Sequence, residues 1–254
     1  MSFKKLTALV IVFFICFIGF AIALLPASVA IQLGQSHMPK GLKLGPATGS
    51  IWQGQVNGVQ YQGQYLSRVK WDIHPSALLG MKLKADVIVG NKRNTGEVSA
   101  NGLVKYGLSD GALQLEHVRA RVALETVLSQ VKLPVPTEAK GLVFLELDTY
   151  ELGQPHCGEM AGVISSADIN VKGRNGWFSI GELEGELSCV NGSASVKVSK
   201  ENLLGLQVDA GFNQRGQLTV DGFIKPDASL PKDVHDAVQF IGSQSADGRY
   251  RISF

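Results

Sequence analysis

Apolar and polar residues alternate with a period of two from residue 49 to residue 225. Val69, Trp71 and Ile73 fall on one side of an expected strand, and charged or polar residues fill the positions between them. Because successive side chains of a strand point to opposite faces, this pattern predicts strands with one apolar and one wet face. Further strands are expected at 82–89, 142–147, 169–171, 194–198, 204–212, 218–224 and 250–254.

Turn signals separate these runs. Asn-Gly or Asp-Gly pairs suit type I′ turns because both residues tolerate a positive φ. They predict consecutive antiparallel hairpins and therefore a meander sheet. The seven pairs begin at Asn57, Asn101, Asp110, Asn175, Asn191, Asp221 and Asp247.

Helical patterning is scarce in this part of the chain. One turn is expected at 75–79, two turns at 125–131, and a short amphipathic helix at 231–241 with Ser229 as its cap. The predicted fold class is mainly β: one N-terminal transmembrane helix, then a strongly curved antiparallel meander sheet in two similar halves, with a few short helices.

The two halves are expected at about 42–132 and 141–254, within one β domain over 26–254. Each contains a Leu-Leu-Gly connector, at Leu78 and at Leu203. Between them, Pro134 and Pro136 cannot donate to a strand ladder, so this stretch is interpreted as a hinge.

The most apolar segment runs from Leu6 to Leu25, with Thr7 as its one strongly polar side chain. Twenty helical residues reach about 30 Å, the thickness of the hydrocarbon layer. Lys4 and Lys5 are the only charged residues before residue 40, and the positive-inside rule holds the 1–5 tip in the cytoplasm. A cleaved signal peptide is the alternative, with small residues at 28–30. Under either interpretation, the chain after this segment lies outside the cytoplasm.

The cysteines agree with that compartment. Cys157 and Cys189 are the only two in the exported part, and an even number in an oxidising space predicts a disulfide. Cys16 lies inside the apolar segment, where it packs or faces lipid. A metal site at His156 and Cys157 would need two further ligands, and no suitable spacing supplies them.

No enzymatic motif stands out. The five histidines are scattered without metal spacing, and the chain lacks a nucleophile elbow, a phosphate loop and a dinucleotide fingerprint. Ser-x-x-Lys occurs at Ser129, but it recurs at Ser67 and Ser2, which marks the pattern as chance. The 24 basic and 22 acidic residues nearly balance, so nucleic acid is not an expected partner. The sequence predicts no catalytic residue, no metal and no cofactor.

Two tryptophans lie near the start of the expected sheet. Trp52 and Trp71 are interpreted as anchors of core layers beneath a hairpin, and contact with a partner protein is the alternative.

Several motifs, taken in order, carry a family resemblance. They are Leu25-Pro26-Ala27-Ser28, Gly49-Ser50-Ile51-Trp52-Gln53-Gly54, Val69 to Pro75 with Leu78-Leu79-Gly80 following, and Leu230-Pro231 leading to Asp247-Gly248-Arg249-Tyr250. Together they resemble protein N of the bacterial type II secretion system, the general secretory pathway N family. The likeness extends over essentially the whole chain.

The resemblance implies a single-pass inner-membrane protein of a Gram-negative bacterium with a periplasmic β body. It implies a non-catalytic accessory of the machine that moves folded periplasmic proteins across the outer membrane. The implied partners are the inner-membrane platform proteins C, L and M of that system. The family supplies no catalytic residues to carry over.

A second hypothesis comes from the sheet itself. A membrane-anchored meander with one continuous apolar face also resembles the periplasmic lipid-binding groove proteins of the AsmA type. An open apolar trough would favour lipid, whereas a face covered by helices and loops would favour a protein-binding module.

Overall fold

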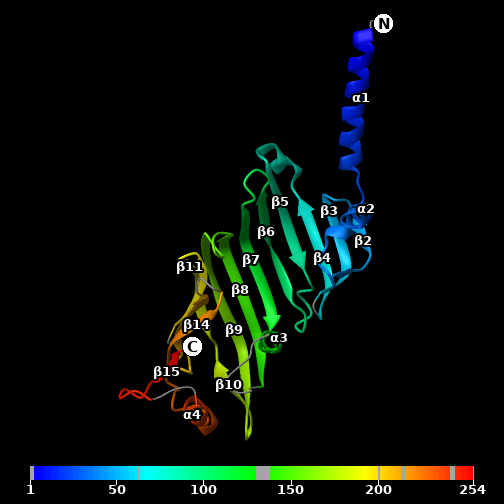
Figure 1. The fold of residues 1–254 in the computed structure, drawn as a ribbon. Helices are drawn as coiled ribbons and strands as arrows, with labels where there is room; N and C mark the ends of the chain where they lie inside the picture. Colours follow the sequence, from blue (N-terminus) through cyan, green and yellow to red (C-terminus); the bar gives the residue numbers. More distant parts are fainter. Residues whose placement is uncertain are drawn as a thin grey trace.

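The computed structural model describes residues 3–61, 63–129, 138–199, 201–212, 216–240 and 244–253, and side-chain environments from residue 9 on except at 37. Its helices are few and mostly short. They are α1 (Phe3–Ala23), α2 (Ala27–Gly34), α3 (Leu124–Leu128) and α4 (Lys232–Val238), with 3₁₀ turns η1 (Gln35–His37) and η2 (Pro75–Gly80). Figure 1 shows α1 standing away from the rest of the chain.

The body is one antiparallel sheet. Its strands follow the order β1-β3-β4-β5-β6-β7-β8-β9-β11-β12-β13-β14-β15, and β2 and β10 pair with β3 and β9. Neighbours in this order are almost always consecutive in the chain, so the predicted meander is confirmed. The bounds are β1 Lys43–Leu44, β2 Ala47–Gly49, β3 Gln53–Tyr61, β4 Gln64–Ile73, β5 Lys82–Val89, β6 Ser99–Gly107, β7 Leu113–Ala123, β8 Ala139–Glu151, β9 Glu159–Gly173, β10 Gly176–Gly181, β11 Glu184–Val190, β12 Ser193–Val198, β13 Gln207–Phe212, β14 Leu218–Ile224 and β15 Tyr250–Ser253.

Strand register gives the sheet one apolar and one polar face from β4 to β15. Directly opposed residues share a face. The apolar face is built by the opposed pairs Trp71 with Val87, Ala85 with Val104, Val104 with Leu115, Ala120 with Leu145, and Val196 with Ala210. The polar face is built by pairs such as Asp72 with Asp86, Arg119 with Glu146, and Glu186 with Lys197.

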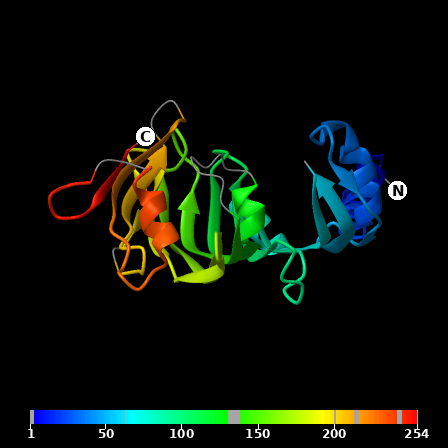
Figure 2. The same ribbon diagram turned by 90° about the horizontal axis from the view of Figure 1, so that it is seen from below.

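Helices cover the two ends of the sheet. At the C-terminal end, Val238 of α4 is 3% exposed and packs with Val208, Ile224 and Ile252 in one hydrophobic cluster. At the other end, α2 packs against β2. Figure 2 shows these helices at opposite ends of the sheet, with α3 between them. Packing of α4 removes apolar strand residues from water, the main stabilising effect available to an antiparallel sheet.

The prediction of a strongly curved sheet is wrong. The sheet is open and neither strongly curled nor closed, so its edge strands β1 and β15 stay far apart (Figures 1 and 2). Right-handed twist accumulates along a wide antiparallel sheet without bringing its edges together. Because α2 and α4 cover the ends, the sheet does not have to fold over itself there.

The predicted transmembrane helix over 6–25 corresponds in position to α1. Across the residues that the structure describes, no helix combines the length and apolar character needed to cross a membrane.

Three of the seven Gly-containing pairs lie inside strands, where hairpin turns were predicted. Asn57-Gly58, Asn101-Gly102 and Asp221-Gly222 belong to β3, β6 and β14. At Gly102 the reason is a close approach, because a Cβ there would lie 2.7 Å from Val118 Cγ2 across a β-bulge. The prediction is confirmed at Asn191-Gly192, where both residues have positive φ, 51° and 79°, between β11 and β12.

The short helices lie near their expected positions. η2, α3 and α4 overlap the predicted ranges, although residues 130–137, with the expected hinge, lie outside the described part. The predicted cap of α4 is wrong. Pro231 holds the N-cap position without a side-chain hydrogen bond, while the Ser229 hydroxyl donates to Asp227 Oδ1 at 2.6 Å. That contact closes a turn before the helix.

Candidate functional site

Ionisable groups are dispersed over the sheet. Among the residues described, no three His, Cys, Asp or Glu side chains gather in a way that could hold a metal ion. His74 Nε2 lies 2.7 Å from Asp86 Oδ2 on the polar face, whereas His156 lies in the loop before β9. Ser129 donates its hydroxyl to the Thr126 carbonyl at 2.7 Å, and Lys132 of the Ser-x-x-Lys pattern lies outside the described residues.

Among the described residues, three carboxyl groups have shifted pKa values, each through a local hydrogen bond. Lys105 Nζ donates to Glu116 Oε1 at 2.6 Å and lowers the pKa of that carboxyl. The Ser229 hydroxyl lowers the pKa of Asp227. The backbone N–H of Arg249 lowers the pKa of Asp247. These shifts favour ionised carboxylates, which is the direction expected for structural contacts and opposite to that needed by a general acid at neutral pH.

A disulfide links the loop between β8 and β9 to strand β11. Cys157 and Cys189 are its partners, and Cys157 is 1% exposed. The N–H groups of His156 and Cys157 both donate to the carbonyl of Gly192, each at 2.9 Å. The disulfide and these bonds therefore fix the β8–β9 loop against the β11–β12 hairpin. Cys16 is free and exposed in α1.

The two singled-out tryptophans lie at the start of the sheet. Trp52 donates its indole N–H to the carbonyl of Ile22, in α1, at 3.3 Å. Trp71 donates its own to the carbonyl of Ile51 at 2.9 Å. Nearby, the Ile51 N–H donates to the carbonyl of Leu25 at 3.0 Å. The tryptophans therefore help to join the end of α1 to β3 and β4. The side chains of Lys4, Lys5 and Leu6 lie outside the described part.

Parts of the apolar face stay open to solvent. On this face Tyr106 is 41% exposed, Phe212 46% and Leu218 50%. Large apolar side chains exposed on a sheet mark surfaces suited to a partner or a ligand. The candidate functional region is therefore a surface, with no convergent cluster of reactive groups in the described residues.

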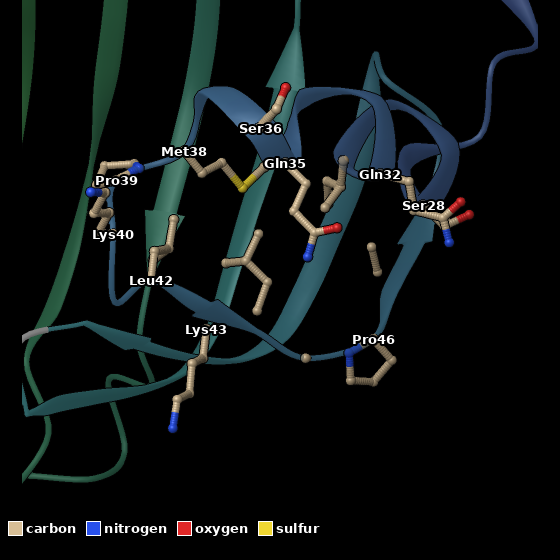
Figure 3. A pocket seen from close by; sticks show the side chains of 14 residues that line it. Ser28, Gln32, Gln35, Ser36, Met38, Pro39, Lys40, Leu42, Lys43 and Pro46 are labelled. Atoms are coloured by element: carbon tan, nitrogen blue, oxygen red, sulfur yellow. The ribbon is translucent and has the colours of Figure 1, made fainter.

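A cavity of about 920 Å³ lies at the N-terminal end of the body. Figure 3 shows it between α2 with η1 on one side and β1 with β2 on the other. This cavity was not predicted from the sequence. A signal was present in the sequence, since Lys40 and Lys43 are the first charged residues after the apolar segment and both line the cavity.

These features define a class of protein with an apolar N-terminal helix and a wide, open antiparallel sheet that presents one apolar face. The family model described as type II secretion system (T2SS), protein N, matches residues 40–253. The chain belongs to this family, as its sequence motifs indicated, and is a component of type II secretion machinery.

Curated relatives extend the same likeness. A type II secretion system protein N from Vibrio cholerae is 29% identical over 89% of this chain and 88% of its own length. One from Aeromonas hydrophila is 23% identical over 99% and 98%, and one from Klebsiella pneumoniae is 22% identical over 82% and 80%. No solved structure matches the chain.

Proposed function

We propose that the protein is a non-catalytic accessory subunit of the type II secretion system, anchored in the bacterial inner membrane, which supports export of folded periplasmic proteins across the outer membrane. The observation that carries the proposal is the family match over residues 40–253, which spans the whole sheet. With one extended sheet as its matched region, the protein is proposed to act by contact through the faces and edges of that sheet.

The proposed anchor is the segment from Leu6 to Leu25. Its support is a row of large apolar side chains exposed along α1, a surface suited to lipid. Leu9, Phe13, Phe17 and Phe20 are each more than half exposed. Lys4 and Lys5 would then hold residues 1–5 in the cytoplasm, which leaves 26–254 in the periplasm. The disulfide between Cys157 and Cys189 suits that oxidising compartment.

Two surfaces are proposed to contact other subunits, namely the platform proteins C, L and M. The first is the exposed part of the apolar face, at Tyr106 on β6 and at the opposed pair Phe212 and Leu218 on β13 and β14. The second is the edge strand β15, which ends the strand order. Among the described residues, only Tyr250 is bridged on its outer side, by Gln244. An unpaired strand edge can accept another protein's strand through main-chain hydrogen bonds.

The test is deletion of the gene followed by complementation. We expect the deletion to lower secretion of folded exoproteins, to lower the levels of platform subunits, or both, and the wild-type gene to restore them. Normal secretion together with normal levels of C, L and M in the deleted strain would refute the proposal. A version without residues 1–25, directed to the periplasm by a cleavable signal, tests the anchor separately and is expected to complement poorly.

A second candidate is the periplasmic lipid-binding groove, because parts of the apolar face, such as Phe212 and Leu218, are exposed. Aromatic and aliphatic side chains that are about half exposed could contact an acyl chain. Mass spectrometry of the purified protein distinguishes the candidates. Stoichiometric lipid lost on a Phe212→Asp substitution favours the groove, and secretion that survives this substitution weakens the proposed role of the apolar face in subunit contact.

A further inference from the structure

The cavity beside α2 combines apolar walls with polar groups. Ile31, Met38 and Leu42 supply apolar surface, and Gln32 and Gln35 supply amides. Figure 3 shows Gln35 extending from the helical side toward the strands. A volume of about 920 Å³ lies within the range of small-molecule sites, about 300 to 1,000 Å³. Apolar walls with a few polar groups suit an amphipathic ligand.

The charge at this cavity has one sign. Lys40 and Lys43 line it, and neither forms an ion pair with another described residue. The first acidic residue of the whole chain is Asp72, so no carboxylate from the first 71 residues can neutralise these lysines. Two unpaired ammonium groups complement an anion. The amide N–H groups of Gln32 and Gln35 add neutral donors to the same cavity.

The cavity also lies next to the proposed anchor. α1 ends at Ala23 and α2 begins at Ala27, so only three residues separate the apolar helix from the wall of the cavity. This junction is held by the contact of Trp52 Nε1 with the Ile22 carbonyl and by an antiparallel bridge between Pro26 and Ser50. A molecule in the cavity would therefore lie close to the surface of the membrane that α1 enters.

We propose that this cavity binds an anionic phospholipid, with the ammonium groups of Lys40 and Lys43 at its rim attracting the negatively charged head group and the apolar walls around the first carbons of the acyl chains. The inference rests on the proposed membrane anchor, because that anchor places the cavity beside lipid. We propose a lipid phosphate as the ligand instead of free phosphate, since free phosphate would leave the apolar walls of the cavity exposed to water.

The experiment is native mass spectrometry of the full chain in detergent micelles that contain equal amounts of dioleoyl phosphatidylglycerol and dioleoyl phosphatidylcholine. The double variant Lys40→Gln/Lys43→Gln removes the two cavity charges. The matched control Lys82→Gln/Lys84→Gln removes two charges from β5 at the same cost in net charge. Gln35→Phe, at an exposed position, fills the cavity without altering charge. Inorganic phosphate is added as a competitor in a separate arm.

We expect the wild type and the β5 control to retain phosphatidylglycerol in preference to phosphatidylcholine. We expect the Lys40 and Lys43 double variant to retain about tenfold less phosphatidylglycerol. Each lysine near an anionic lipid strengthens the binding of that lipid roughly several-fold. Gln35→Phe should reduce retention as well, and phosphate should not displace the lipid. Equal retention by both double variants, equal retention of the two lipids, or full displacement by phosphate would each overturn the inference.

A further experiment tests whether an acidic protein segment, instead of a lipid, occupies the cavity. Cross-linking from Lys43 in cells to an acidic protein, with no preferential phosphatidylglycerol retention in micelles, would contradict the lipid site. The micelle assay does not depend on anchoring, whereas resistance of the protein to alkaline extraction from membranes tests the anchor alone. A failed anchor and an empty cavity therefore give different results.

Discussion

Trp71 and Gly54 are cross-strand partners, and the indole of Trp71 occupies the space that a side chain at Gly54 would need. A Cβ built on Gly54 would lie 2.4 Å from Trp71 Cζ2 and 2.8 Å from the Ser50 carbonyl oxygen. The same indole donates its N–H to the Ile51 carbonyl. Residue 54 therefore has to be glycine for the β3–β4 pair to close around Trp71.

Gly54→Val should destabilise the body by about 1 to 3 kcal/mol, since the added carbons force the indole or the strand to move. Thermal unfolding of the purified protein measures this. Gly80→Ala is the matched control, because nothing lies within 4 Å of a Cβ there, and its effect should stay within about 0.5 kcal/mol. Equal melting temperatures for Gly54→Val and the wild type would contradict the packing described.

Loss of the disulfide should cost about 3.7 kcal/mol, because Cys157 and Cys189 are separated by 32 residues and their link restricts the unfolded chain. Cys157→Ser/Cys189→Ser tests this in denaturant unfolding, with Cys16→Ser as the control. Because Cys16 is a free cysteine, the Cys16→Ser variant should unfold like the wild type. A double variant as stable as the wild type would show that the disulfide contributes nothing to the body.

The Lys105–Glu116 contact makes stability depend on pH. Its hydrogen bond lowers the pKa of Glu116 in the folded protein below the ordinary value of 4.5. The stabilisation is therefore complete above about pH 4.5 and is lost as pH falls through the lower folded pKa. Because both side chains are more than a quarter exposed, the contribution is at most about 1 kcal/mol.

Glu116→Gln should remove this part of the acid sensitivity. Melting temperatures at pH 6 and pH 3 are the measurement, and Glu138→Gln, at a more exposed ion pair with Lys172, is the comparison. The difference between the two pH values should shrink more for Glu116→Gln. An unchanged difference in this variant would count against the assigned contact.

Trp52→Phe should loosen the junction between α1 and the sheet by removing the hydrogen bond to Ile22, worth about 0.5 to 1.5 kcal/mol. Limited digestion with trypsin measures this loosening, because the cleavage sites Lys40 and Lys43 lie between α1 and β3. Cleavage there should become a few times faster through local opening. Trp177→Phe, at an exposed site in β10, is the control, and equal rates for the two variants would contradict the role of Trp52.

Period-two alternation predicted most strands because one face of each is apolar and the other wet. The spacing of Val69, Trp71 and Ile73 placed β4, and register then put Trp71 opposite Val87 as the pattern required. Turn dipeptides were less reliable, since glycine serves close approach as well as turns. At Gly222 a Cβ would lie 2.2 Å from the Gln207 carbonyl oxygen, and this cross-strand contact cannot be inferred from the local sequence.

The overall shape and the cavity could not be predicted for a related reason. Curvature depends on which face is covered and where, and the packing of Val238 against Ile252 joins residues whose partnership no local pattern encodes. The cavity needs α2 to pack against β2, a contact that no local pattern encodes. The charges of Lys40 and Lys43 were visible in the sequence, but their common placement required the structure.

The body is proposed to work by contact with other secretion proteins, and photo-crosslinking in secreting cells detects such contacts. A photoreactive residue replaces Phe212 on the exposed apolar face, and a matched one replaces Lys197 on the polar face of the neighbouring strand. We predict adducts from position 212 to platform protein C, L or M and few from position 197. Active secretion without any protein adduct at position 212, or with lipid adducts alone, would contradict the account.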